Sequence, residues 1–534
     1  MTKKRILGFV LAGAMLIGVL AACATAQPPA APVTPAAPSA PGAPAPTPGA
    51  PPPPPPEEGL GRGVRVALAI EPPNIVPARH TQLVAGFMNA LTHNGLFEAS
   101  HVDLSPMPDL ITGWRAISDT LFEFDLVQGV RFHNGDELTS YDIMATMEYI
   151  RNFPEARAQH LSVVDWEVVD RYTFRLDTGE PNAQLFFDLA HHANNIFPGA
   201  LIEAGHDFTV DPVGTGPFVF DEWRSGDFLH FNAFPDYFNT ERAPRIEHVH
   251  WRIIPEGSSR TIALETGEID YIVEVPFPDI ARLEASPDVT VFMTPGTMMQ
   301  MFALNNAREP FNNVYVRRAI DMALDRDAML MASLDGFGFA TYATMQPIFA
   351  GASNEGTRSF DPEGARQLLA EQGFAPGDIE FEVLFFAEDQ RRRGEVVQSN
   401  LADIGITISL TMMEQAAWLP HTTQDIFDAT FQNQTQPNLM AHMRAVMHSD
   451  SIDGPNRSRM SNPELDALID QAFATIDEAE RLAVLLEASR VANEHVGFIG
   501  TNSSMTIRAF NSNLVAPEIG PGGAMFFNMV YWLD

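Results

Sequence analysis

The sequence predicts an α/β fold for the part of the chain that follows residue 61. Strand-like runs alternate with segments of helical periodicity from about residue 62 onward, which is the pattern of mixed α/β architecture. Hydrophobic residues make up 45% of the chain and charged residues 19%, which is typical of a globular protein. After the first twenty residues no stretch reaches about 18 uninterrupted apolar residues, so we expect a body that does not span a membrane.

The chain begins with a basic start, a short apolar run and its only cysteine. Lys3, Lys4 and Arg5 precede the apolar residues 6–20, and Leu20-Ala21-Ala22-Cys23 ends the run. This arrangement is typical of a secretory signal peptide. The ending resembles the bacterial lipobox, in which the cysteine is lipidated and becomes the mature N-terminus. A short membrane helix is the alternative, but about 15 apolar residues fall short of the roughly 20 needed to span a bilayer.

A proline-rich segment follows. Residues 28–56 hold 15 of the 42 prolines, interspersed mainly with alanine. Such a composition cannot bury a core and favours extended polyproline II, so we expect a stiff tether between the anchor and the body. A ligand for an SH3-type domain is the rival interpretation, and an extracytoplasmic location argues against it.

The first elements of the body are read from alternation and turn chemistry. Residues 64–70 and 122–127 alternate as strands, Asn134-Gly135 signals a turn, and Thr139 with Asp142 fits a capping box that opens a helix through about residue 151. Further helices are predicted at 316–332, 362–372, 388–404, 463–473 and 478–491, and further strands at 379–386, 407–412 and 428–431.

Charge and residue usage exclude several functions. With 33 Lys+Arg against 68 Asp+Glu, the formal charge of −35 repels phosphate backbones, so no nucleic-acid partner is expected. No lysine follows Lys4, which excludes a Walker A loop and Schiff-base chemistry in the body. One cysteine allows neither an intrachain disulfide nor a cysteine metal cage. A secreted hydrolase is the weakest alternative, because neither Gly-x-Ser-x-Gly nor His-Glu-x-x-His occurs.

Seven motifs, in order, resemble one family across roughly residues 62–534: the extracytoplasmic solute-binding proteins that include dipeptide- and oligopeptide-binding components of ABC importers. The motifs are Gly129–Asp142, Pro212–Phe218 with Trp223 beyond it, Arg252–Pro255 with Ala263–Asp270, Leu304–Asn306 with Pro310–Arg326, Phe360–Phe374, Gln398–Ile406 and Asn462–Asp466.

The resemblance implies a two-lobed periplasmic-binding-protein fold (Venus flytrap, class II or cluster C) with an extra inserted domain. The chain would cross between the main lobes near residues 293 and 500, so that closing the cleft bends only two strands. The implied divisions are a signal peptide at 1–22, a lipidated Cys23 and tether at 23–61, lobe I at 62–97, 206–293 and 501–534, an extra domain at 98–205, and lobe II at 294–500.

The resemblance also implies a function. The protein would be a monomeric, lipid-anchored receptor on the outer side of the membrane. It would capture a small molecule or short peptide and deliver it to an ABC permease with its ATPase subunits. No cofactor, no metal and no catalysis are expected.

In the family, solute lies between the lobes, and peptide-binding members hold the ligand ammonium with an acid in a segment that corresponds to Asp428–Asn438. Here neutral residues replace the later acids, and a neutral group cannot supply the charge-assisted hydrogen bond that a buried ammonium needs. Peptides with free termini are therefore in doubt as ligands. The predicted contact residues are Met298, Met299, Gln300, Asn433, Gln434, Thr435 and Gln436, and Trp418 in the loop after residue 412. For Met298, Met299 and Trp418, core packing is the alternative.

Two histidine pairs leave a metal or metallophore receptor of the same fold as a further alternative. His248 and His250 would share one face of a strand, whereas adjacent His191 and His192 would point apart on a helix. Two ligands do not make a metal site, so ordinary surface histidines are the simpler interpretation. A signalling receptor without a permease also stays open.

Overall fold

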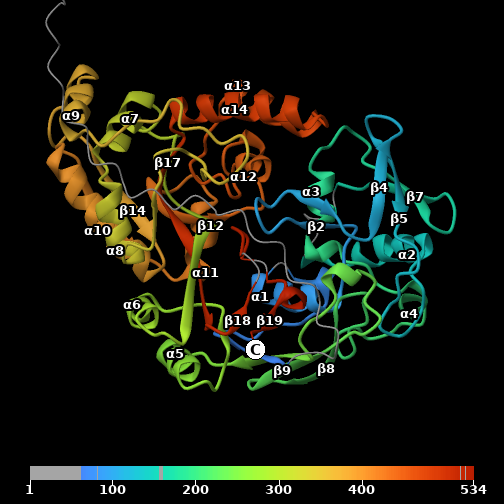
Figure 1. Cartoon of the computed structure of the whole chain (residues 1–534). Coiled ribbons are helices and arrows are strands. Elements are labelled where there is room, and N and C mark those ends of the chain that lie inside the picture. The colour runs from blue at the N-terminus through green and yellow to red at the C-terminus, as the bar shows by residue number, and fades with distance from the viewer. Residues whose placement is uncertain are drawn as a thin grey trace, which may run out of the picture. The chain divides into compact units, whose positions relative to one another are not determined.

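The computed structural model describes residues 62–80, 82–155, 160, 162–516, 519–523 and 525–533. The predicted signal peptide, Cys23 and the proline-rich tether lie outside these residues. Within them helices and strands alternate along the chain, as the sequence predicts (Figure 1). None of the helices in the described part is long and apolar enough to cross a bilayer.

One large sheet organises the molecule. Its strands follow the order β15-β14-β16-β12-β17-β11-β1-β10-β9-β8, and β13 pairs with β17 outside this path. The strands are β1 (Val64–Leu68), β8 (Phe218–Arg224), β9 (Phe228–Ala233), β10 (His248–Ile253), β11 (Tyr271–Ile272), β12 (Val289–Leu304), β13 (Gly338–Ala340), β14 (Glu380–Phe385), β15 (Thr407–Met412), β16 (Ala429–Thr435) and β17 (Phe498–Asn511).

Two long strands, β12 and β17, belong to both halves of this sheet. They pair with each other antiparallel, from Val289 opposite Asn511 to Ala303 opposite Phe498. The second half of β12 also pairs with β16, and the second half of β17 also pairs with β11. The sheet therefore divides into two lobes that share this one strand pair.

Each lobe has its own buried core. In the first lobe, Val66, Phe231 and Trp251 pack with α1 (Leu83–Thr92), and smaller helices α5 (Gly257–Glu265) and α6 (Ile280–Glu284) cover the neighbouring apolar surface. In the second, Phe302 and Phe431 form one core. The helices of the second lobe are α7 (Val314–Ala323), α8 (Arg326–Leu334), α9 (Pro362–Glu371), α10 (Glu388–Asp403), α11 (Gln415–Thr422), α12 (Leu439–Val446), α13 (Pro463–Ala474) and α14 (Glu478–His495).

A separate antiparallel sheet lies between β1 and β8 in the sequence. Its order is β4-β5-β7-β6, and Phe122, Phe124 and Phe174 fill the core beneath it. The elements of this inserted part are the hairpin β2 (Phe97–Ala99) and β3 (Pro106–Pro108), strands β4 (Ile111–Ala116), β5 (Leu121–Leu126), β6 (Asp165–Val168) and β7 (Thr173–Asp177), and helices α2 (Ser140–Ile150), α3 (Leu185–Leu189) and α4 (Gly199–Glu203). A short pair, β18 (Leu514–Val515) and β19 (Tyr531–Trp532), ends the described chain.

The turn at Pro212–Phe218 shows why glycine is required there. A side chain on Gly214 would lie 2.2 Å from the backbone oxygen of Thr92, and one on Gly216 would lie 2.4 Å from that of Leu91. Real Cβ contacts are never so short, so this turn packs against the end of α1 only because its two glycines have no side chains.

Most predicted elements are confirmed, including the capping box at Thr139 and Asp142 that opens α2. The helix predicted over 316–332 is wrong. The chain leaves the helix at Leu324, and the Asp325 carboxylate accepts a hydrogen bond from the Ala328 amide to start α8. The guanidinium of Arg326, the first residue of α8, pairs with Asp321, one turn earlier in the chain.

Candidate functional site

The two shared strands are irregular where they pass between the lobes. Pro295 lies opposite Met505 and Met299 lies opposite Ser503, so β12 takes four steps where β17 takes two. The two extra residues form a bulge, which interrupts the ladder and lets a strand bend. We call residues 295–299 of β12 and 503–505 of β17 the crossing.

A few contacts hold this bulge. The Gln346 side-chain amide donates to the carbonyl of Thr297, and the Ser504 hydroxyl donates to the carbonyl of Met298 over 3.4 Å. Gln346 itself is buried in the second lobe. The bulge is therefore fastened to the second lobe, while the preceding residues of β12 run alongside the first-lobe half of β17.

The structure brings most of the predicted contact residues together beside the crossing. In the β12–β16 register, Met298 lies opposite Thr435, Met299 opposite Gln434 and Gln300 opposite Asn433. Gln436 follows directly where β16 ends. Thr435 is exposed, and Met298, Asn433, Gln434 and Gln436 are half-buried. These five residues make the end of β16 beside the crossing largely neutral and polar, with Met298, Asn433 and Thr435 on one face of the sheet and Gln434 on the other.

Three predicted residues are buried instead. Met299 is fully buried and packs among Met301, Ala303 and other residues of the second lobe. Gln300 is also fully buried, where its amide oxygen accepts a hydrogen bond from Ser333 over 3.1 Å and its nitrogen lies 3.5 Å from the Asp389 carboxylate. Both residues hold β12 in place through buried contacts. For Met299 this agrees with the core-packing alternative.

Trp418 is the third, and it lies on helix α11 rather than in the loop that the sequence predicts. Its indole nitrogen donates to the Thr430 hydroxyl over 2.9 Å, and its ring packs 4.7 Å from that of Phe386. The guanidinium of Arg457 lies over the indole at 4.6 Å. Trp418 therefore braces β16 from one side, as its core-packing alternative describes.

The connections of the second lobe explain why a site forms at this edge. From β14 the chain runs through α10 to β15 on one side, and then through α11 to β16 on the other side of β14. Such a reversal of strand order leaves a crevice outside the carboxyl ends of the strands, where ligands bind in open α/β sheets. The carboxyl end of β16 meets the crossing, where Thr435 lies opposite Met298.

A model of the family described as bacterial extracellular solute-binding proteins, family 5, matches residues 105–450. The chain belongs to this family.

Individual relatives support the family assignment. The chain is 27% identical over 332 residues to the glutathione-binding protein GsiB of Salmonella paratyphi A, covering 60% of this chain and 64% of that protein. It is 25% identical over 448 residues to heme-binding protein A of Haemophilus influenzae, covering 76% of this chain and 80% of that one. The match to GsiB thus spans less than two thirds of that relative's length.

Solved structures establish the fold. HbpA2 from Haemophilus parasuis superposes with a TM-score of 0.82 at 22% identity, over 89% of this chain and 100% of that one. The periplasmic binding protein DppA from Helicobacter pylori, in complex with the peptide STSA, superposes with a TM-score of 0.72 at 21% identity, over 89% and 99% of the two chains. The fold is therefore that of the two-lobed periplasmic binding proteins, and both family and fold are those of binding proteins.

Arg393, which sequence reasoning missed, lies directly under the polar surface of this family member. Its side chain is fully buried against the ring of Phe431, 4.8 Å from the ring centre, and one nitrogen donates to Asn433 over 3.3 Å. Its Nε and Nη1 atoms have no hydrogen-bond partner among the described residues, and burial lowers the pKa of the guanidinium to about 10. The sequence did indicate that Arg393 is buried, because Arg393, Val397 and Leu401 share a four-residue spacing on the buried face of α10.

A cavity of about 380 Å³ adjoins the site and was also missed. It lies between the inserted part and the second lobe, and it begins at Pro437 and Asn438, directly after Gln436. Two hydrogen bonds close this boundary, from the Ala183 amide to the Phe473 carbonyl (2.7 Å) and from Asn438 to Gln184 (3.3 Å). Local sequence patterns could not predict this cavity, because two segments far apart in the chain line it.

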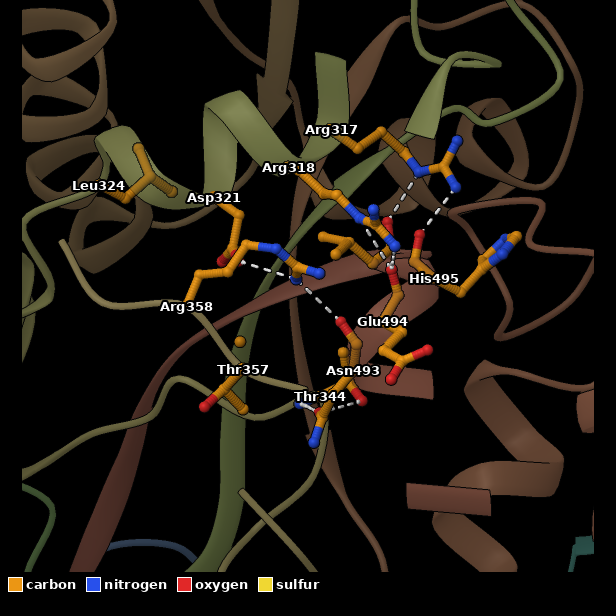
Figure 2. A network of polar contacts seen from close by, with 12 residues as sticks. Arg317, Arg318, Asp321, Leu324, Thr344, Thr357, Arg358, Asn493, Glu494 and His495 are labelled. Carbon is orange, nitrogen blue, oxygen red and sulfur yellow. Dashed lines mark hydrogen bonds and ion pairs between the residues drawn. The ribbon is translucent and has the colours of Figure 1, made fainter. Parts of the chain in front are cut away.

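A larger cavity of about 680 Å³ lies at the far end of β12, and its arginines are already engaged. Arg317 donates to the carbonyls of Phe311, His495 and Val496, and Arg318 donates to that of Glu494. Figure 2 shows these arginines gathered at the C-terminal end of α14, with Arg358 donating to the carbonyl of Asn493. The last carbonyls of a helix lack partners within the helix and favour cations, so this cluster caps α14.

The histidine pairs do not assemble a metal site. His230 on β9 joins His250, with their Nδ1 atoms 3.0 Å apart, and its ring also lies beside that of His248. His191 and His192 lie in and next to a short 3-10 turn, where His192 stacks on His80. No group of three or more metal-binding side chains with suitable geometry occurs among the described residues.

Proposed function

We propose that this protein is the solute-binding receptor of an ABC importer. It captures a small solute, a peptide or peptide-like compound, between its lobes and delivers the closed form to a permease. Family membership supports this proposal, and the bulged strand pair beside a half-exposed polar surface is the observation that carries it. A cleft that closes on two bending strands needs no bond chemistry, and solute drives closure because it binds the closed form more tightly.

The proposed lobes meet next to the crossing. Lobe I comprises residues 62–97, 206–293 and 501–534, lobe II comprises residues 294–500, and residues 98–205 form the extra domain. The separate cores of the described residues support this division. The protein acts as a monomer in this proposal, because the capture of one solute needs only its own two lobes.

The proposed contact surface consists of Met298, Gln434, Thr435 and Gln436, with Asn433 and Gln300 behind it. This surface lacks the acidic anchor of peptide-binding relatives. Asp428 stands at the opposite end of β16, where its carboxylate lies 3.4 Å from the guanidinium of Arg308. A solute without a free ammonium group, such as an amino-blocked or modified peptide, suits this surface best.

Cys23 is the proposed membrane attachment. The lipobox-like sequence before it and the proline-rich residues 28–56 after it support a lipid anchor with a stiff spacer. Expression of the full chain and of a Cys23→Ser variant tests this directly. The intact chain should partition with membranes and incorporate labelled palmitate, and the variant should do neither. Palmitate labelling of the Cys23→Ser variant would contradict the assignment.

Retained ligand tests the proposed function most directly. The protein is purified under mild conditions and denatured, and mass spectrometry identifies what it releases. The released solute is then returned to ligand-free protein during small-angle scattering, and the radius of gyration should fall as the lobes close. Identical scattering with every solute class, combined with turnover of any of them, would contradict the proposal.

A further inference from the structure

The cavity between the inserted part and the second lobe has an aromatic wall on one side. Trp114 packs against Phe186 in a tilted arrangement with ring centres 4.5 Å apart, and Phe97 meets the edge of the same Phe186 ring at 5.6 Å. Trp114 remains 40% exposed although it is large and apolar. An aromatic side chain that its own domain leaves uncovered at the mouth of a cavity is available to a ligand.

The opposite wall comes from the second lobe and is also apolar. The side chains of Phe349, Leu439, Met440 and Leu485 line it, and each is at least nine-tenths buried. Met adapts its shape to varied partners, and Leu offers no polar atom. A volume of about 380 Å³ lies within the range of small-molecule sites.

Apart from Glu478, which is exposed, the polar side chains at the rim are already bonded to the protein. The Asp103 carboxylate accepts from the amide and hydroxyl of Ser105, and the Asn438 side chain both caps α12 and reaches Gln184. Arg481 donates to the carbonyls of Thr475 and Ile476. The cavity therefore offers an apolar interior and little free charge, which selects an uncharged group.

The position of the cavity links it to the contact surface at the crossing. Pro437 and Asn438 line the cavity, and they follow residues 434–436 without a break in the chain. A solute that rests on those residues can extend along the chain into the cavity. Because its two walls belong to parts of the chain far apart in sequence, the cavity is complete only while those parts are in contact.

We propose that this cavity binds the uncharged apolar part of the solute, a ring or a branched hydrocarbon chain, while the polar end of the solute contacts residues 434–436. This inference rests on the proposed function and specifies its substrate class. A solute of this shape stabilises the closed form twice, once at the crossing and once at the boundary of the inserted part.

The test uses N-phenyl-1-naphthylamine, an uncharged ring compound whose fluorescence rises in apolar sites. The full chain should bind the probe, and the Trp114→Ala and Phe186→Ala variants should each bind it at least tenfold more weakly. Ala350→Trp adds bulk from an exposed position on the cavity rim and should weaken binding similarly without disturbing the core. The solute released from the purified protein should displace the probe.

Trp166→Ala is the matched control, because Trp166 lies on the other outer strand of the same four-stranded sheet. Its probe affinity should stay within twofold of the parent, with circular dichroism confirming the fold of every variant. Unchanged affinity in Trp114→Ala and Ala350→Trp, with a solute that still compacts the protein, overturns the inference and leaves the proposed function standing. Probe binding that depends on Trp114, in a protein that no solute compacts, contradicts the proposed function instead.

Discussion

Two buried arginines of the second lobe differ in how the protein accommodates their charge. Arg326 pairs with Asp321, donates to the carbonyls of Thr341 and Gly500, and lies over the ring of Tyr342. Among the described residues, Arg393 donates one hydrogen bond, to Asn433, and has an aromatic face and the charge of Asp389 near it. A buried charge whose donors all have hydrogen-bond partners makes the folded state costly to disrupt, because removing it leaves those partners unpaired. Buried donors without partners destabilise the folded state instead.

Substitution by methionine should separate the two cases. Arg326→Met leaves Asp321 without its closest partner and should lower the free energy of unfolding by about 3–5 kcal/mol. Arg393→Met removes two unpartnered donors and should be neutral or stabilising by up to about 2 kcal/mol. Urea denaturation of both variants measures this. Equal destabilisation would mean that Arg393 has partners which its described surroundings do not supply.

Buried histidines should make the protein sensitive to acid. His442 is nearly inaccessible, and burial lowers its pKa from 6.5 to about 4, although the Thr344 carbonyl near its Nε2 opposes this shift. The folded state keeps His442 neutral, so its contribution is complete above pH 6.5 and declines as the pH falls toward 4.

At pH 5 the loss from this residue should be about 2 kcal/mol relative to pH 7.5. His442→Gln should remove that part of the pH dependence, because glutamine does not titrate. Denaturation curves at the two pH values check the expectation. The same change at the half-buried His421 serves as the control for residue type. A wild-type pH dependence in His442→Gln would refute the assignment.

At the scale of the elements, local patterns were sufficient for most helices and strands but not for the site. Caps and periodicity predicted α9, α10, α13 and β15 closely. The break at Leu324 carries no proline or glycine, so periodicity alone runs through it, and only the cap at Asp325 marks it. The pairing of residues 298–300 with 433–435 depends on the register of strands whose paired residues lie 133 to 137 positions apart, which no local pattern encodes.

The absence of long-range information in local patterns also explains the errors at individual site residues. Trp418 is a residue type that suits a binding cleft, so the sequence predicted it as a ligand contact. Its indole instead donates to Thr430, a contact that exists only after β16 and α11 pack together. Arg393 was missed because arginine is almost never fully buried unless it is paired. Its position on the buried stripe of α10 was the readable clue.

Close packing at β17 gives a prediction for the strand pair. A side chain on Gly500 would lie 2.2 Å from the Ala343 carbonyl oxygen and 2.6 Å from the Met299 side chain. Gly500→Ala should therefore displace one of them and destabilise the protein by about 1–3 kcal/mol in thermal or urea unfolding. Gly113→Ala, in a strand with open space around the new methyl group, should change stability by less than about 1 kcal/mol. Equal effects would argue against overpacking.

At the scale of the whole molecule, the inserted part makes a second connection between the halves. Ala183 is 1% exposed and belongs to the buried cluster of the second lobe, although it lies in the sequence of the inserted part. Phe187 and Leu104 pack against the same cluster. In the proposed closure, this apolar contact would be involved as well as the bending of two strands.

Ala183→Arg should separate these parts, because a guanidinium cannot enter the apolar cluster without a partner. The radius of gyration from small-angle scattering should rise, and the solute affinity should fall at least tenfold. Ala116→Arg, on an exposed edge of the same inserted sheet, is the matched control and should change neither quantity. An unchanged radius in Ala183→Arg would show that the contact does not hold the halves together.

The two ends of the described chain lie together. The indole of Trp532 donates to the carbonyl of Gly63 over 3.3 Å, and the Arg62 guanidinium lies 3.8 Å above the same ring. A pull or a fused reporter at either end of the described chain therefore acts on the lobe that contains β1, and mechanical load reaches the remainder through β12, β17 and the inserted part. In the proposed closure the lobe that carries α9 and α10 moves relative to this one, so a dye on it would report each capture event against a second dye near Trp532.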